Sequence, residues 1–280
     1  VRHLMKYDVV SFDVFDTLIL RAVERPVDVF RLLEAEWGMI GFAKIREEAE
    51  QRARIGKIEV TMDEIYQILS DELCIDKQTA IEKELQMEEK VCYANPYMRE
   101  VFGKLIEAGR TVVAVSDMYL PEAALRRLLK RCGYSGIAKI FVSCDYKKTK
   151  GSGKLQRAVQ EKMGSSLSYI HIGDQKYSDI EASRRIGWDA LYYPNVTEQG
   201  RPYRQSGMDS LAASFYKGLV NSRLHCGVCP RSGLYEYGYA YGGIMAVGYC
   251  QYLERLVKQE GFDQLLFVAR DGYILRRIYE

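Results

Sequence analysis

Strand-like and helix-like segments alternate between residues 111 and 193, and this alternation constrains the fold more than any other feature of the sequence. A chain that alternates in this way forms a parallel sheet with helices on both faces. A further strand-like segment lies near the start of the chain. We therefore predict an α/β fold, a Rossmann-like doubly wound parallel sheet. The strand-like segments are 7–12, 111–115, 140–143, 169–172 and 190–193, and the helix-like ones between them are 121–132, 152–163 and 179–186.

A long block with helix signals and no strand signal, residues 26–109, separates the first strand from the others. Thr61-Met62-Asp63-Glu64 is a capping box that starts one of its helices, and Asn95-Pro96 interrupts the run. Because the block follows directly on the first strand, we expect it to lie over the strand ends as a helical cap. The predicted domains are a core of residues 1–20 and 110–199 and a cap of residues 21–109.

The remaining residues, 200–280, are harder to assign. Residues 200–233 are polar and favour a loop, and residues 235–260 favour a long helix rich in tyrosine and small residues. The strand-like segment 264–269 predicts the start of a partial second α/β region. The amphipathic end of the chain, residues 271–280, lacks an apolar partner in the sequence, so we expect the native protein to be longer.

The composition limits the possible partners. The chain is 48% apolar and 28% charged with a net charge of +2, which is ordinary for a globular protein and gives no field that favours nucleic acid or a membrane surface. The longest apolar run, 238–250, is shorter than the roughly 20 residues that span a bilayer. Seven scattered cysteines without an export signal predict reduced thiols and a cytoplasmic location. Cys226 and Cys229 have the spacing of half a metal site, but no second pair accompanies them.

Side chains that suit phosphoryl transfer follow the predicted strands. Asp13 follows the first strand, Ser116 the second, Asp174 and Asp179 the fourth, and Lys150 stands just before a helix. The carboxyl ends of parallel strands meet at one edge of a sheet, so these groups should converge. Asp13 and Asp174 would hold Mg²⁺, Asp13 would attack phosphorus, and Ser116 and Lys150 would neutralise phosphate oxygens.

Four motifs in this order resemble those of the haloacid dehalogenase-like (HAD) hydrolase superfamily. The likeness covers residues 7–195, and the helical block resembles the inserted cap of that family. The motifs are Phe12-Asp13-Val14-Phe15-Asp16-Thr17-Leu18, Val115-Ser116-Asp117, Lys150-Gly151-Ser152-Gly153-Lys154-Leu155 and Ile172-Gly173-Asp174-Gln175-Lys176-Tyr177-Ser178-Asp179-Ile180.

The resemblance implies a Mg²⁺-dependent phosphohydrolase or phosphotransferase that acts on a small phosphorylated metabolite, such as a sugar phosphate, through an aspartyl-phosphate intermediate. Arg21, just past the first motif, is a candidate for contact with an anionic substrate, although it is equally well read as an exposed charge. The assigned residues are Asp13, Ser116 and Lys150 for catalysis, Ser116, Asp117, Lys150 and Arg21 for substrate binding, and Asp13, the backbone of Phe15, Asp174 and Asp179 for the metal.

The residues of the first two motifs resemble one subgroup of the superfamily in particular. Phe12–Leu18, together with the later Ser116-Asp117-Met118-Tyr119-Leu120, resembles a bacterial subgroup of predicted hydrolases associated with surface-polysaccharide glycosyltransferases. That subgroup carries a second region with a segment similar to residues 267–273. The resemblance implies a glycosyltransferase partner or a C-terminal domain.

Phe15 departs from the phosphatase pattern, which has an aspartate there as general acid and base. Phenylalanine transfers no proton, and general acid–base help is worth about 10²–10⁴-fold. Asp16, one residue further, would substitute only if its side chain pointed into the site, and we expect it to point elsewhere. The alternative function is therefore a catalytically weak binding or regulatory module.

Two other reaction types of the superfamily stay open, dehalogenation and phosphonate hydrolysis. In the second, Lys44 or Lys57 would be the reactive amine. Lys154 is a second candidate for the lysine of the third motif.

Overall fold

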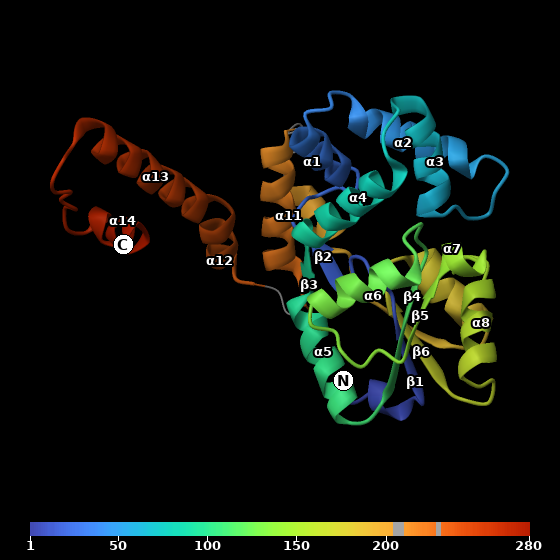
Figure 1. Cartoon of the computed structure of the whole chain (residues 1–280). Helices are drawn as coiled ribbons and strands as arrows, with labels where there is room; N and C mark the ends of the chain where they lie inside the picture. The colour runs from blue at the N-terminus through green and yellow to red at the C-terminus, as the bar shows by residue number, and fades with distance from the viewer. Residues whose placement is uncertain (204–209, 228–230) are drawn as a thin grey trace. The chain divides into compact units, whose positions relative to one another are not determined.

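In the part of the chain that the structure describes, residues 1–203, 210–227 and 231–280, five parallel strands form one sheet. The computed structural model orders them β5-β4-β1-β6-β7 (Figure 1). Strand β1 is central, so Ser11 lies opposite Val113 of β4 and His171 of β6. The predicted α/β sheet is confirmed. The strands are β1 (Val9–Phe12), β4 (Thr111–Ser116), β5 (Lys139–Val142), β6 (Tyr169–Gly173) and β7 (Asp189–Tyr192).

The central strand is buried on both faces of the sheet. Val10 and Phe12 belong to one hydrophobic cluster, with Leu105 from a helix on that face. Val9 belongs to a second cluster on the other face, which contains Leu155. Successive side chains of a strand point to opposite faces, so a strand covered on both sides reads as a continuous apolar run. This burial leaves only the strand ends to carry polar chemistry.

Helices follow the strands of this core largely as predicted. The sequence predicts one regular helix over 179–186, but the structure has a π-helical turn (Lys176–Glu181) followed by the short α9 (Ala182–Arg185). The π-helical turn contains Asp179, and π-helical turns occur frequently at functional sites. The other core helices are α5 (Pro96–Glu107), α6 (Glu122–Arg131), α7 (Ser143–Tyr146), α8 (Lys154–Met163) and α10 (Val196–Gly200), with short 3-10 turns at Leu4–Lys6 and Arg201–Tyr203.

The helical block inserted after β1 is present, and Figure 1 shows its helices grouped together. The capping box forms as predicted, since Glu64 N donates to Thr61 Oγ1 and Thr61 N donates to Glu64 Oε2. The block is not purely helical, however. Ile19 pairs with Ala94 in a short antiparallel ribbon, which the local pattern did not predict because its strands have three residues each. The elements are β2 (Ile19–Arg21), α1 (Asp28–Trp37), α2 (Phe42–Arg54), α3 (Met62–Leu73), α4 (Lys77–Val91) and β3 (Cys92–Ala94).

A buried charge pair holds the helices of the inserted block together and joins them to the sheet. Arg46 of α2 donates from Nε and Nη2 to the Glu84 carboxylate of α4 at 2.7 and 3.0 Å, and both side chains are fully buried. Tyr66 of α3 donates to Glu84 Oε2 at 2.7 Å. Tyr119, which follows β4, donates to Glu84 Oε1 at 2.9 Å. The Glu84 carboxylate thus links helices α2, α3 and α4 of the inserted block with a loop beside the sheet edge.

The first compact unit extends beyond the predicted core boundary at residue 199 and runs from Val1 to Val228. The loop predicted over 200–233 is wrong in part, because helix α11 (Leu211–His225), capped by Ser210, packs against α10 and α1. Its buried face mixes apolar residues such as Val220 with polar or small ones such as Ser214 and Asn221, so the local pattern shows little helical periodicity. A side chain at Gly218 would meet Ala22 O at 2.3 Å, so this approach requires glycine.

The second compact unit, Cys229–Glu280, contains only helices and irregular segments among its described residues. The predicted long helix is present as α12 (Gly233–Tyr237), a π-helical turn (Gly238–Gly242) and α13 (Gly243–Glu260), and α14 (Asp271–Tyr279) follows. The strand predicted over 264–269 is not formed; these residues are irregular. The apolar run of these residues therefore did not establish a further α/β region.

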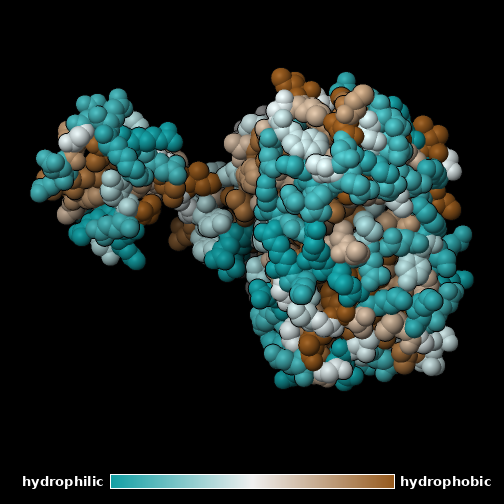
Figure 2. All heavy atoms as spheres, viewed as in Figure 1, coloured by the Kyte–Doolittle hydropathy of each residue, from teal (hydrophilic) through white to brown (hydrophobic). Residues whose placement is uncertain are grey.

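The surface is mainly hydrophilic on the face of the first unit that Figure 2 shows. Across residues 1–203, 210–227 and 231–280, no helix has both the length and the apolar character needed to cross a bilayer. The six described cysteines are free thiols.

Replacing Arg46 by leucine should lower the free energy of unfolding by about 3–5 kcal/mol, because the Glu84 carboxylate would remain buried without its cation. Urea denaturation monitored by circular dichroism measures this change. Arg52→Leu on the same helix is the matched control, since the Arg52–Glu72 pair is exposed and should be worth at most about 1 kcal/mol. Equal losses in the two variants would contradict the role of the buried pair.

Candidate active site

The carboxyl ends of β1, β4 and β6 border a cavity of about 370 Å³. Asp13 directly follows β1, Ser116 ends β4 and Asp174 directly follows β6. Lys150 reaches the same cavity from the segment between α7 and α8. The structure therefore brings these four side chains together at one sheet edge, although they lie up to 161 positions apart in the chain.

Lys150 lies between two carboxylates. Its Nζ is 2.5 Å from Asp13 Oδ1 and 2.6 Å from Asp179 Oδ1, and all three side chains are buried. Its backbone N–H donates to both oxygens of Asp117 at 2.9 and 3.1 Å, so Asp117, predicted to bind substrate, also fixes the loop that carries the lysine. Lys154, the other candidate, is exposed at the start of α8. Of the two lysines, only Lys150 lines the cavity.

Asp179 is held by a second layer of hydrogen bonds. Its Oδ2 accepts from Gln175 N at 2.9 Å, and its Oδ1 lies 3.2 Å from His171 Nε2. His171 Nδ1 lies 2.8 Å from Ser11 Oγ. Because a carboxylate accepts and the hydroxyl can donate, the proton of a neutral His171 belongs on Nε2. His171, buried inside β6, thus orients Asp179, and burial lowers the pKa of the His171 imidazole.

The electrostatics of this cluster follow from burial. Burial raises the pKa of Asp13, the charges of Asp179 and Asp174 add to the rise, and Lys150 opposes it. Burial also acts to raise the pKa of Asp179, but Lys150 and His171 outweigh it and hold that pKa below its usual range. The Lys150 ammonium stays charged, because Asp13 and Asp179 outweigh the effect of its burial and raise its pKa.

Asp13, Asp174 and Asp179 together have the chemistry of a hard-cation site. They offer one carboxylate oxygen each within 4.8 Å of one another, and all three residues are buried. Three carboxylates face one ammonium, so the cluster has an excess of negative charge. An oxygen-only donor set of this kind suits Mg²⁺. Both oxygens of Asp179 already accept hydrogen bonds, so Asp13 and Asp174 are better placed to contribute a free oxygen.

Phe15 and Arg21 lie side by side, and both line the cavity that Asp13 also lines. The Arg21 guanidinium sits 4.0 Å from the centre of the Phe15 ring. Arg21 also makes a buried two-point ion pair with Glu88 of α4, at 2.9 and 3.0 Å. The alternative that Arg21 is an exposed charge is therefore wrong. The charge of Arg21 is already balanced by Glu88 where it lines the cavity.

Asp16 lines the cavity, contrary to the expectation that its side chain would point elsewhere. Its backbone is left-handed, with φ of 59°, and its N–H donates to Ile19 O at 2.8 Å. Burial raises the pKa of its carboxyl to about 6, with Arg21 acting in the opposite direction. A carboxyl with this pKa exchanges its proton near neutral pH.

Asn195 is a site residue that the sequence did not single out. It caps α10, where its Oδ1 accepts from Thr197 N and Glu198 N. Its Nδ2 donates to Asp174 Oδ2 at 2.8 Å, so the same side chain also orients Asp174. In the sequence, Asn195 follows a strand-like segment and a proline. This pattern predicts a residue that caps a helix and does not predict a site residue.

The remaining candidates lie apart from the cavity. Lys44 pairs with Glu48 and Lys57 pairs with Glu64, and neither lysine is part of the cavity lining. Cys226 Sγ lies 2.9 Å from Asn95 Oδ1. Cys229 lies outside the described residues, so the spacing of Cys226 and Cys229 as half a metal site stays a prediction.

Comparisons with known proteins agree with this fold. No protein-family model matches the sequence, and no curated protein matches it significantly. A 2-haloacid dehalogenase from Pseudomonas syringae pv. tomato DC3000 is 16% identical with a TM-score of 0.50, over 73% of this chain and 91% of that chain. An L-2-haloacid dehalogenase from Xanthobacter autotrophicus is 13% identical with a TM-score of 0.50, over 75% and 86%. At these identities the likeness establishes a shared HAD-type fold.

A magnesium-bound HAD-hydrolase from Bacillus subtilis is also similar. It is 20% identical with a TM-score of 0.48, over 66% of this chain and 88% of that chain.

Replacing Asp16 by asparagine should stabilise the metal-free protein more at about pH 7.5 than at about pH 4. The pKa of Asp16 is about 6 in the folded protein and 3.8 in the unfolded chain, so the folded protein holds this proton more tightly. The wild type therefore loses stability as the pH rises from the lower of these pKa values to the higher one. Asparagine tolerates the left-handed backbone and carries no charge. Urea denaturation in EDTA measures the free energy of unfolding. We expect the increase of this free energy in the variant over the wild type to be about 2 kcal/mol larger at the higher pH than at the lower one.

Asp8→Asn is the control with the opposite sign. Hydrogen bonds from Ser168 hold the pKa of Asp8 below its usual range, so this variant should lose stability at the higher pH. An Asp16→Asn difference that does not change with pH would contradict the assignment.

Proposed function

We propose that the chain is a Mg²⁺-dependent phosphohydrolase or phosphotransferase of the HAD type that acts on a small phosphorylated metabolite. One observation carries the proposal: the buried Lys150 ammonium touches Asp13 and Asp179, and Lys150 and Asp13 line a cavity at the carboxyl edge of the sheet. An excess of carboxylates over ammonium groups favours a site completed by a divalent cation. The same excess of carboxylates would repel the carboxylate of a halogenated acid. It therefore disfavours a dehalogenase reaction, in which Asp13 would attack such a substrate without a metal.

Asp13 is the proposed nucleophile. One of its carboxylate oxygens forms a bond to phosphorus, the ester P–O bond breaks, and the electron pair leaves with the ester oxygen. Water then attacks phosphorus in the aspartyl phosphate, and the bond between phosphorus and the Asp13 oxygen breaks, with its electron pair returning to the carboxylate. Inorganic phosphate leaves, and the proton that the water gives up passes to the phosphate or to solvent. Lys150 balances negative charge on the phosphoryl oxygens, and the Ser116 hydroxyl donates a hydrogen bond to one of them.

The metal would be held by Asp13 and Asp174, with Asp179 and the backbone carbonyl of Phe15 as further candidates. When bound, Mg²⁺ offsets the negative charge of the phosphoryl group. Asn195 and Gln175 keep Asp174 in position through hydrogen bonds of 2.8 Å each to its Oδ2. The residues of this chain thus hold the donor oxygens in place before a cation arrives.

The cap limits the substrate. Phe30 of α1 and Glu50 of α2 line the same cavity as Asp13. A volume of about 370 Å³ falls within the range of small-molecule sites, roughly 300–1,000 Å³. A compact phosphate ester, of which a sugar phosphate is one example, meets these limits.

Phe15 favours a second candidate function. It places a ring under Arg21 where the phosphatase pattern has a proton donor. A phosphate–magnesium pocket without that donor would bind its ligand and turn it over slowly or not at all. The motif likeness suggests that such a module would serve a glycosyltransferase partner or a C-terminal domain.

Hydrolysis of p-nitrophenyl phosphate in the presence of Mg²⁺ tests the proposed function, because its leaving group needs no proton. We expect turnover that EDTA removes and that Asp13→Asn lowers by at least about 10³-fold, since the nucleophile is lost. Asp8→Asn, at the amino end of β1, is the matched control and should keep the activity. Activity that survives in Asp13→Asn or in EDTA would refute the mechanism.

Introducing an acid at position 15 separates the two candidate functions. Phe15→Asp should raise the hydrolysis of an alkyl phosphate such as n-butyl phosphate by about 10²-fold, and that of p-nitrophenyl phosphate much less, because only the alkoxide needs a proton. Phe15→Asn, of the same size and without an acid, is the control. A silent wild type that gains activity in Phe15→Asp would favour the binding module. An active wild type whose alkyl phosphate rate does not rise in Phe15→Asp would show that another group supplies the proton.

A further inference from the structure

The cavity beside Asp13 has a carboxylate on its helical side as well as at the sheet edge. Glu50 of α2, in the inserted helical block, lines this cavity together with Asp13, which follows β1. Apolar side chains such as Val27, Phe30 and Met118 belong to the same lining. A ligand whose phosphoryl group lies against Asp13 would therefore have its remaining part among apolar groups and the Glu50 carboxylate.

Two arginines hold the Glu50 carboxylate in place. Its Oε1 accepts from Arg54 Nε and Nη2 at 3.0 and 2.7 Å, and its Oε2 accepts from Arg46 Nη1 at 3.1 Å. A carboxylate has about four acceptor positions, and these hydrogen bonds from the described residues use three of them. The Glu50 side chain is 21% exposed, so a ligand can reach it. Its Oε2 is thus a fixed oxygen that can accept one more hydrogen bond.

The ion pairs around Glu50 leave an excess of negative charge. Arg46 is shared with Glu84, to which it donates two hydrogen bonds. Arg54 is shared with Glu59, at 3.7 Å. Within this linked group of described residues, three carboxylates share two guanidinium groups. A cation placed beside Glu50 would therefore be attracted, and an anion repelled.

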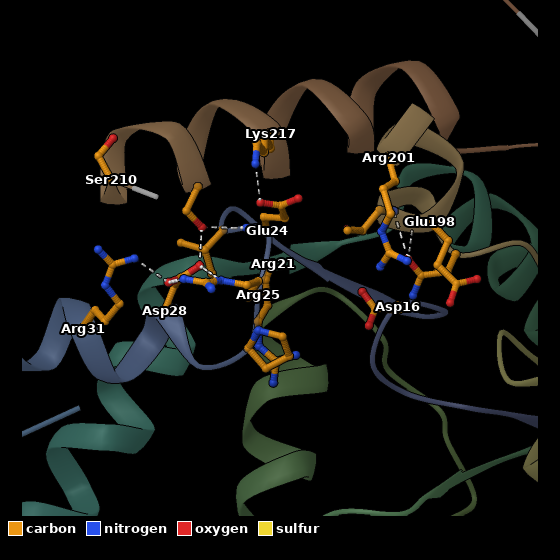
Figure 3. A pocket seen from close by; sticks show the side chains of 15 residues that line it. Asp16, Arg21, Glu24, Arg25, Asp28, Arg31, Glu198, Arg201, Ser210 and Lys217 are labelled. Carbon is orange, nitrogen blue, oxygen red and sulfur yellow. Dashed lines mark hydrogen bonds and ion pairs between the residues drawn. The ribbon is translucent and has the colours of Figure 1, made fainter. Parts of the chain in front are cut away.

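The other charged residues of the cavity lining have the same excess. Among the described residues, the lining contains five acidic and two basic ones, namely Asp13, Asp16, Glu50, Asp117 and Asp174 against Arg21 and Lys150. Lys150 touches Asp13 and Asp179, and Arg21 pairs with Glu88. Figure 3 shows Arg21 and Asp16 in the neighbouring cavity, of about 420 Å³, that both residues also line. A single Mg²⁺ would offset only part of this excess.

We infer that Glu50 is a specificity-determining residue that binds an ammonium group on the leaving-group part of the substrate. The inference rests on the proposed function, because the transferred phosphoryl group would lie beside Asp13. An ammonium donates a charge-assisted hydrogen bond to a carboxylate, and its alkyl stem packs well on apolar surface. The substrate class is thus a phosphate monoester of an amino alcohol.

Three matched series of esters test this inference on the whole chain with Mg²⁺. The probes are ω-aminoalkyl, ω-hydroxyalkyl and plain alkyl monophosphates with ethyl, butyl and hexyl chains, and phosphate release is measured. We expect the KM of the alkyl ester to exceed that of the aminoalkyl ester by about 10-fold or more for at least one length. The kcat values should be similar, because a contact away from phosphorus acts equally on the bound substrate and on the transition state. The hydroxyalkyl ester should have a KM closer to that of the alkyl ester.

Glu50→Gln should bring the ratio of alkyl KM to aminoalkyl KM close to one, because it removes the negative charge. Arg46 keeps its pair with Glu84, so the fold should survive. Glu82→Gln is the matched control, since Glu82 of α4 pairs with Arg127 and is not part of the cavity lining. It should keep the wild-type ratio. Circular dichroism checks that both variants fold; if Glu50→Gln does not, the three series on the wild type decide.

Three results would overturn the inference. The first is a KM ratio near one at every chain length in the wild type. The second is a hydroxyalkyl ester that binds as well as the aminoalkyl ester, since hydrogen bonding and not charge would then select the substrate. The third is a preference for the aminoalkyl ester that survives in Glu50→Gln.

The same probes separate this inference from the proposed function. If the esters are hydrolysed in an Asp13-dependent manner but the aminoalkyl ester is not preferred, only the role of Glu50 is misassigned. If no ester is hydrolysed, the proposed enzyme function fails, and thermal denaturation with each probe then decides the binding question. A larger stabilisation by the aminoalkyl ester, lost in Glu50→Gln, would support the ammonium site; equal stabilisation by all three esters would overturn it.

Discussion

The placement of one ammonium among buried carboxylates is the constraint on which the site depends. An unpaired charge in this interior would cost many kcal/mol, so Lys150 must sit against Asp13 and Asp179. That requirement fixes three segments at once: the end of β1, the turn after β6 and the loop before α8. The Asp117 carboxylate holds the backbone of the third segment, which leaves the lysine little freedom to move. The result is a rigidly held Asp13 at the carboxyl edge of the sheet, in a cluster with more carboxylates than ammonium groups.

A second buried carboxylate, Glu84, does the same for the inserted helical block. It accepts from Arg46, Tyr66 and Tyr119, and Tyr119 follows β4 of the sheet. Moving the helical block away from the sheet would break the Tyr119 hydrogen bond and expose a polar group that is fully buried. Arg21, paired with Glu88 of α4 and lying over Phe15, adds a second link between the helical block and the loop after β1. The position of the helical block is therefore coupled to the site through hydrogen bonds and not through apolar packing alone.

Prediction from sequence succeeded for elements with a local signal and failed for elements that depend on remote contacts. The strands of the central sheet have continuous apolar runs, and the capping box at Thr61 is a local signal, so both could be read directly. Helix α11 buries serine, glycine and asparagine, and β3 owes its existence to pairing with β2 far away in the chain. The irregular segment 264–269 has the apolar run of a buried strand but no strand partner among the described residues. A strand needs such a partner for its backbone hydrogen bonds, and a local apolar run does not supply one.

The sequence by itself determined the order of strands and helices and therefore which side chains reach the carboxyl edge of the sheet: Asp13, Ser116, Lys150 and Asp174. These positions follow from local periodicity and from the geometry of parallel sheets. Only the tertiary structure decided what each side chain does there. Asp16 joins the cavity lining because of a left-handed turn, and Asn195 orients Asp174 across 21 residues of sequence. Such roles depend on distances between segments remote in the chain, which no local pattern encodes.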